Sequence, residues 1–134
     1  MLLYMHKEEI ELFLKRASNF LDGAKERFQK EDWDLTCFMA EQFVQLLLKA
    51  TILEKGGEIP KTHSIRKLFG ILYQLTNDEV FKYDRKALIF LESAYLNSRY
   101  FSFVYEKEDA KEALKIAEEV KRIVENVRDD DKNE

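Results

Sequence analysis

The chain has 134 residues, of which 46% are hydrophobic and 36% are charged, and its net charge at pH 7 is −4. This length and apolar content suit one soluble domain with a buried core. The acidic balance argues against a protein that coats nucleic acid through bulk electrostatics, although it is compatible with a local basic site. No apolar run approaches the length of a membrane span, and His6, Lys7 and Glu8 interrupt the N-terminal apolar residues, so a cytoplasmic protein is expected. The single cysteine, Cys37, lies on an apolar helical stripe and is expected to be a small core residue.

The first half of the chain predicts two long helices. The first covers residues 7–30, on apolar residues that repeat at helical spacing: Ile10, Phe13, Leu14, Ala17, Phe20, Leu21, Ala24 and Phe28. Asp32 is a candidate N-cap for the second, over residues 33–55. Gly56 and Gly57 end this helix, and Pro60 closes the connection that follows.

Three more helices are predicted in the second half: residues 64–76, 85–99 and 107–128. Asp84 is a candidate cap for the fourth helix. No segment alternates with period two for long enough to indicate a strand, so the expected fold is an all-α, up-and-down bundle of about five helices. The predicted organisation is one domain over residues 7–128, with a flexible N-terminus at 1–6 and a disordered acidic tail at 129–134.

The second predicted helix carries more apolar surface than one face can hold. Leu46, Leu47 and Leu48 alone cover about 200° around the helix axis, at ~100° per residue. Such a helix is central in its own bundle or part of a subunit interface. We expect both in a domain this small, and therefore a symmetric homodimer. The alternative is a monomer in which this helix is fully enclosed.

The polar residues of the same helix form a strip. Gln42, Gln45 and Lys49 are spaced so that they share one face. They are either the wetted side of the helix, which the spacing alone favours, or amide donors and a cation that line a groove.

The start of the third helix is the most basic part of the chain, with Lys61, His63, Arg66 and Lys67 close together. Thr62 or Ser64 is placed to cap the helix, whose free first-turn amides could hold an anion. For His63 the favoured interpretation is a structural hydrogen bond that fixes the long loop onto the bundle.

The end of the fourth helix places Arg99 inside a run of aromatic residues. Tyr95 precedes it by one helical turn, so its ring can stack under the guanidinium, and Tyr100 follows directly. Two interpretations remain open on this chemistry. Arg99 is either a structural arginine tied to a carboxylate across the bundle, with the aromatics as core, or a phosphate- or base-binding residue at a helix end.

No metal site and no cofactor are predicted. The sequence has no cluster of cysteine and histidine, and its acidic residues are expected to be spread along exposed helix faces. It also lacks a glycine-rich loop of the kind that cradles phosphate.

Taken together, these motifs resemble the HEPN family (higher eukaryotes and prokaryotes nucleotide-binding domain), over roughly residues 7 to 128. The matching features are the helix-two run from Ala40 to Ala50, the pair His63-Ser64 opening the next helix, the Tyr95-Arg99-Tyr100 pattern, and an acidic Glu108-Asp109-Ala110 start to the last helix.

This chain departs from the family pattern at two positions. Gln45 stands where the resemblance implies a glutamate. Family members that act as metal-independent ribonucleases carry a histidine four to six residues after the arginine, whereas this chain has Tyr105 there and no histidine after His63. A tyrosine of ordinary pKa near 10 is a poor base at neutral pH. Tyr105 could still hold a phosphate or base by hydrogen bonding and stacking.

The resemblance implies a dimeric nucleotide- or RNA-binding and interaction module, with robust catalysis not expected. Arg99 would bind phosphate, Tyr95 and Tyr100 would orient it, and Lys49 and His63 would add positive field. It further implies a separately encoded minimal nucleotidyltransferase as partner, in a toxin–antitoxin-like pair. The first alternative is a metal-independent endoribonuclease toxin that uses Arg99 with Tyr105 or His63. The second is a purely structural interaction protein.

Overall fold

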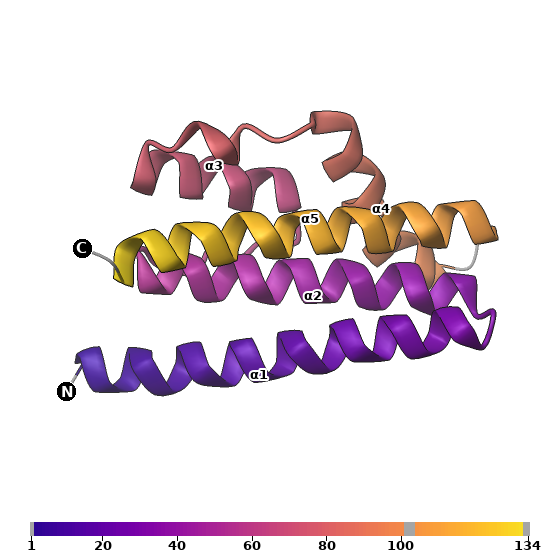
Figure 1. Ribbon diagram of the computed structural model, residues 1–134, viewed down its shortest axis with the longest axis horizontal. Helices are drawn as coiled ribbons and strands as arrows, with labels where there is room; N and C mark the ends of the chain where they lie inside the picture. The colour runs from indigo at the N-terminus through magenta and orange to yellow at the C-terminus, as the bar shows by residue number, and fades with distance from the viewer. Residues whose placement is uncertain (1, 101–103, 133–134) are drawn as a thin grey trace.

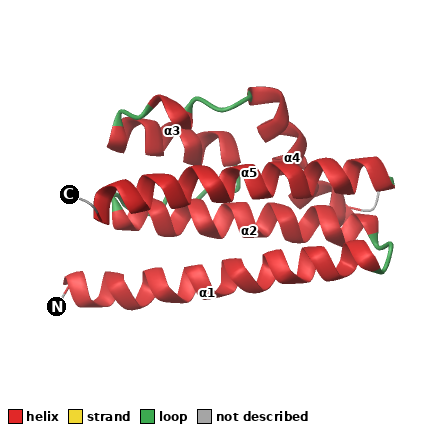
Figure 2. Ribbon diagram, in the orientation of Figure 1, coloured by secondary structure: helices red, strands yellow, loops and turns green. Residues whose placement is uncertain are grey.

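The computed structural model describes the backbone of residues 2–100 and 104–132, and the side chains of residues 6–98 and 104–128. These residues form five α-helices and one short 3₁₀ helix: α1 (Leu2–Gln29), α2 (Trp33–Glu54), α3 (Ile65–Thr76), η1 (Glu79–Phe81), α4 (Arg85–Tyr100) and α5 (Lys107–Lys132). The described ranges contain no strand, so the all-α fold class is confirmed (Figure 2).

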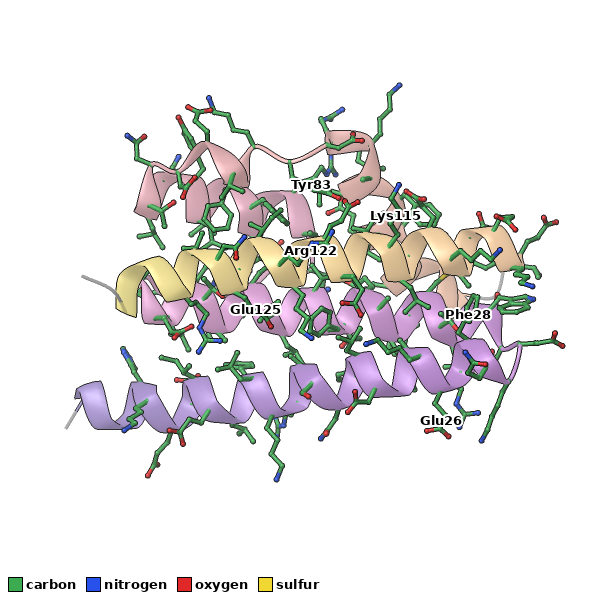
Figure 3. All side chains as sticks on the ribbon, viewed as in Figure 1. Glu26, Phe28, Tyr83, Lys115, Arg122 and Glu125 are labelled. Atoms are coloured by element: carbon green, nitrogen blue, oxygen red, sulfur yellow. The ribbon has the colours of Figure 1, made fainter. Side chains whose placement is uncertain are left out.

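The long helices α1, α2 and α5 run alongside one another, and the shorter α3 and α4 pack on the same central helix (Figure 1). The start of α1 and the end of α5 lie at the same end of the bundle (Figure 1). Near the end of α5, Nε of Arg128 lies 3.0 Å from the Glu54 carboxylate of α2. The exposed side chains of Glu26, Lys115 and Glu125 project from the outer faces of this bundle (Figure 3).

Helix α2 is the centre of the fold. It contacts α1, α3, α4 and α5, and Leu47 and Leu48 are both buried within the single chain. Its length and apolar composition would also suit a membrane span, but two-thirds of that stretch is buried, as in the core helix of a soluble bundle. Most of the apolar surface of α2 is thus covered within the single chain, although Leu46 is half-buried and Leu35 is exposed, so the burial of this helix does not by itself require a second subunit. Cys37 is a fully buried core residue of α2, as predicted.

Three helix starts follow the predicted capping residues. The Asp32 carboxylate accepts from the Leu35 amide, 3.3 Å away, at the start of α2. The Asp84 carboxylate accepts from the Lys86 amide at 3.0 Å as α4 begins. Of the two candidates before α3, Ser64 is the cap. Side-chain oxygens at these positions satisfy amides that the first helical turn leaves without a partner.

The helix ends differ from the prediction mainly at the termini. Helix α1 begins at Leu2, so residues 2–6 are helical although the sequence predicts a flexible segment. Helix α5 extends to Lys132, into the tail that was expected to be disordered. At the end of α2, Gly56 adopts a φ of 85°, a left-handed conformation that glycine takes without strain, and the chain turns there.

Candidate functional site

The bundle contains one fully buried carboxylate, Glu41 of α2, whose side chain is 0% exposed within the described part of the chain. Its oxygens accept hydrogen bonds from the side-chain amides of Gln42, at 2.7 Å, and Gln45. Burial raises the pKa of the Glu41 carboxyl to about 7, while the hydrogen bonds from Gln45 and Gln42 and the charge of Lys49 act in the opposite direction. The expectation that the acidic residues lie on exposed faces is therefore wrong for Glu41.

Gln45 is also buried, at 3% exposure, and is not part of a wetted strip. Besides its bond to Glu41, its amide nitrogen lies 3.3 Å from the backbone oxygen of His63 and donates to it. Lys49, on the same face, is half-buried, and burial lowers the pKa of its ammonium group while the Glu41 carboxylate raises it. Within the strip of Gln42, Gln45 and Lys49, Gln45 is therefore internal and the other two are half-buried, and Glu41 is the partner that a polar group inside a bundle needs.

The side chain of His63 is exposed, and its imidazole stacks on the Tyr95 ring of α4. The ring centroids are 4.1 Å apart and the planes differ by 15°. The bond from Gln45 to the His63 carbonyl holds the loop through its backbone, and not through the imidazole. We call the group of Glu41, Gln45, His63 and Tyr95 the His63 cluster.

A second carboxylate, Glu92 of α4, holds the start of α3. It accepts from the Ser64 hydroxyl at 3.0 Å, from the Arg66 amide at 3.3 Å and from Nε of the Arg66 side chain at 2.5 Å. The next amide, that of Lys67, donates to the Ser64 hydroxyl at 3.3 Å. Glu92 therefore occupies the position at which the sequence suggested an external anion, and this helix start serves a structural role.

Tyr105 lies in the core, with 4% of its surface exposed. Its hydroxyl accepts a hydrogen bond from the Asn97 amide at 3.0 Å, its ring packs edge-on against Phe90, and its backbone amide donates to Asp34 at 2.8 Å. Burial raises the pKa of the Tyr105 hydroxyl further above its ordinary value. This environment favours a structural role for Tyr105 over that of a base or a surface ligand.

The backbone of α4 places Arg99 one helical turn after Tyr95, so both start from the same face of the helix. The side chains of Arg99 and Tyr100 lie outside the described residues. Of the predicted binding residues, Gln42, Gln45 and Lys49 each interact with Glu41, Gln45 also bonds to the His63 backbone, and the His63 ring stacks on Tyr95. Tyr105 lies in the core. Sequence reasoning missed Glu41 although its partners Gln42 and Gln45 are close in the chain. It missed Glu92 because the partners of Glu92 are 26 and 28 residues away.

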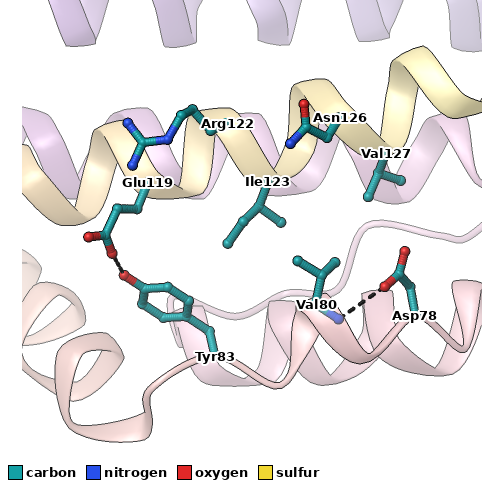
Figure 4. Close-up of a pocket in the computed structure, with 8 residues that line it drawn as sticks. All are labelled: Asp78, Val80, Tyr83, Glu119, Arg122, Ile123, Asn126 and Val127. Atoms are coloured by element: carbon teal, nitrogen blue, oxygen red, sulfur yellow. Dashed lines mark hydrogen bonds between the residues drawn. The ribbon is translucent and has the colours of Figure 1, made fainter.

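Two of the grooves in the described part of the chain lie beside η1 and α3. The larger one, of about 480 Å³, lies between the loop around η1 and helix α5, with Val80, Ile123 and Val127 among its lining residues (Figure 4). Across one end of it the Tyr83 hydroxyl donates to the Glu119 carboxylate, which ties the α3–α4 connection to α5. The smaller groove, of about 250 Å³, lies on α3.

The metal-ligating residue types are not gathered into a site in the part of the chain that has described side chains. No group of three or more histidine, cysteine, aspartate and glutamate residues is placed there to hold an ion. What the geometry does define is an all-α domain whose central helix carries a buried polar cluster that reaches the surface at a stacked histidine and tyrosine.

Comparison with known proteins agrees with this architecture. The sequence matches the HEPN domain family over residues 10–127, and the chain belongs to that family. It is similar in structure to TT1696 from Thermus thermophilus, with a TM-score of 0.71 and 25% identity over 87% of this chain and 96% of that one. It also shares its fold with ST0689, an archaeal HEPN homologue, with a TM-score of 0.67 and 24% identity over 87% of this chain and 95% of that one. No curated protein matches the chain in sequence.

Proposed function

We propose that this HEPN domain is a nucleotide- or RNA-binding and interaction module that holds phosphate with Arg99 beside the His63 cluster. The observation that carries the proposal is the stacking of His63 on Tyr95. Tyr95 precedes Arg99 by one turn of α4. A polarizable aromatic pair next to an arginine offers stacking for a base and a cation for its phosphate.

The buried part of the cluster supports the surface part. Gln45 holds the His63 backbone from below, and Glu41 in turn holds the Gln45 amide. A binding group whose position is fixed by hydrogen bonds underneath loses less conformational entropy when a ligand arrives. Lys49 adds a cation to the same face of α2.

The proposal includes two protein partners. One is a second copy of this chain, and the other is a minimal nucleotidyltransferase in a toxin–antitoxin-like pair. The support for the second copy comes from exposed apolar side chains near the end of α4: Leu96 is 56% exposed and Val104, just before α5, is 78% exposed. Exposed large apolar residues close to a site are typical of interaction surfaces.

A second candidate function is a metal-independent endoribonuclease. The placement of His63 favours it in one respect, because the fold brings an exposed imidazole beside the helix that carries Arg99. An imidazole is the commonest general base in catalysis, whereas burial raises the pKa of the Tyr105 hydroxyl further above its ordinary value. In this version His63, and not Tyr105, replaces the histidine of the family pattern.

The test is to measure binding of labelled oligoribonucleotide, and its cleavage with and without chelator, for the wild type and Arg99→Ala. Arg16→Ala is the matched control, because Arg16 is exposed on α1, away from the site. The binding module predicts loss of binding in Arg99→Ala, unchanged binding in the control, a similar melting temperature for both variants, and no cleavage. A large drop in melting temperature for Arg99→Ala would instead identify a structural arginine. Chelator-resistant cleavage that His63→Ala abolishes would establish the ribonuclease.

A further inference from the structure

The groove on α3 has a distinctive charge. Three of its lining residues, Arg66, Lys82 and Arg85, are cationic, and none of the lining residues is acidic. This is unusual in a chain whose net charge is −4. A local concentration of positive charge in an acidic protein is complementary to an anionic ligand.

The cations differ in how they are engaged. Lys82 pairs with Glu79 at 3.1 Å and lies over the Tyr73 ring at 4.7 Å. Arg66 uses Nε to bind Glu92, which leaves the other four of its five N–H donors outside that bond. Arg85 makes no ion pair with the described side chains. Arg85 is therefore the cation with the most freedom to take up an external anion.

The groove is lined in part by aromatic rings. The half-buried rings of Tyr73 and Tyr83 line it, and the Tyr83 ring stacks 5.8 Å from Phe69, which is buried in the core beneath together with Phe81. Flat aromatic surfaces are platforms on which nucleic-acid bases stack without sequence preference.

A glycine in the middle of helix α3 keeps the groove open. Gly70 is exposed, lines the groove, and a Cβ built on it would meet no atom within 4 Å. Glycine inside a helix is unfavourable relative to alanine, and nothing in the fold requires the small size of Gly70 for packing. The space in front of it is available to a ligand that approaches the helix backbone.

From these observations we propose that the α3 groove is a second nucleotide-binding subsite, which takes one base and its phosphate from a single-stranded RNA held at the His63 cluster. This inference rests on the proposed function. Arg66 links the two places, because it lines the groove and is bound to Glu92, which also holds Ser64 directly after His63. The groove volume of about 250 Å³ is just below the range of about 300–1,000 Å³ that is usual for ligand pockets, so the groove suits no more than one nucleotide.

The test uses the full chain and two labelled RNA probes, an adenosine dinucleotide and an adenosine octanucleotide, with binding followed by fluorescence anisotropy. Gly70→Leu fills the groove, and Gln74→Leu adds the same side chain at an exposed position of α3 that does not line it. Arg85→Glu reverses the free cation, with Lys86→Glu as its control at an exposed neighbour outside the lining. Because leucine favours helix more than glycine does, Gly70→Leu should melt at the wild-type temperature or above it.

The expected result is that the octanucleotide binds the wild type more tightly than the dinucleotide does. Gly70→Leu and Arg85→Glu should each weaken octanucleotide binding by about tenfold, the value of one stacked base, and leave the dinucleotide and both controls unchanged. Unchanged octanucleotide binding in both variants would overturn the subsite while the proposed function stands. An equal loss for both probes would also overturn it, since the groove would then be part of the first site. If neither probe binds the wild type, both proposals fail.

Discussion

The imidazole of His63 and the ring of Tyr95 lie face to face, with centroids 4.1 Å apart, although one belongs to the loop before α3 and the other to α4. This contact joins the two elements at the surface, directly above the hydrogen bond that Gln45 makes to the His63 carbonyl. The loop is thus held on two sides, by stacking and by a buried amide. A binding surface fixed in this way is ordered before any ligand arrives.

The stacked ring of Tyr95 should matter for ligand binding through its aromatic face. We expect Tyr95→Ala to weaken binding of an oligoribonucleotide by about tenfold, in line with the loss of one stacking contact. Tyr95→Phe keeps the ring against His63 and should bind as the wild type does. Fluorescence anisotropy titrations of the three proteins make the comparison. Equal losses in the alanine and phenylalanine variants would show that the hydroxyl, and not the stacking, is what counts.

Glu41 predicts an unusual dependence of stability on pH. Its pKa is about 7 in the folded protein and its ordinary value is 4.5, so between these values the folded state binds more protons than the unfolded state. The contribution of Glu41 to the free energy of unfolding therefore decreases as pH rises from about 4.5 to about 7, by on the order of 3 kcal/mol. Glu41→Gln removes this titration, because the amide is neutral at every pH.

Urea unfolding between pH 4.5 and 8 checks this prediction. Across this range the free energy of unfolding of the wild type should decrease relative to that of Glu41→Gln as pH rises. Glu125→Gln is the matched control, since Glu125 is exposed on α5 and should follow the wild type. A pH-independent difference between wild type and Glu41→Gln would mean that Glu41 is ionised throughout.

Much of the fold can be predicted from local sequence, whereas the candidate site can be predicted only in part. Helical spacing and the caps Asp32 and Asp84 are local signals, so the helices other than η1 are predicted with most inner ends within a residue or two. The burial of Glu41 depends instead on neighbours from distant parts of the chain. Nothing in the sequence around Glu41 indicates that α3 and α4 pack against α2.

The same reasoning explains Tyr105. The sequence places it beside Arg99 in an aromatic run, which suggests a surface role. In the fold its backbone amide donates to the distant Asp34 and its hydroxyl accepts from Asn97, eight residues earlier, and neither bond has a sequence motif.

The central position of α2 predicts a large cost for removing its core side chains. Leu48 is fully buried, so Leu48→Ala should lower the free energy of unfolding by about 2–5 kcal/mol, the range for leucine truncation in a packed core. Leu12→Ala, at a position that is nearly half-exposed on α1, should change it by no more than about 0.5 kcal/mol. Urea denaturation with unchanged slope would give both values. A small effect at Leu48 would mean that the bundle relaxes into the cavity.

The proposed homodimer has its own test, which no longer depends on α2. If a second copy covers the exposed apolar surface near the end of α4, Leu96→Glu places a charge in that interface and should shift the protein to monomer in light scattering behind a sizing column. Because Leu96 is more than half exposed in the single chain, the fold and its melting temperature should be preserved. Leu12→Glu, on the exposed face of α1, should leave the assembly unchanged. A dimer that survives Leu96→Glu would place the contact elsewhere, and a wild type that is already monomeric would remove the dimer from the proposed function.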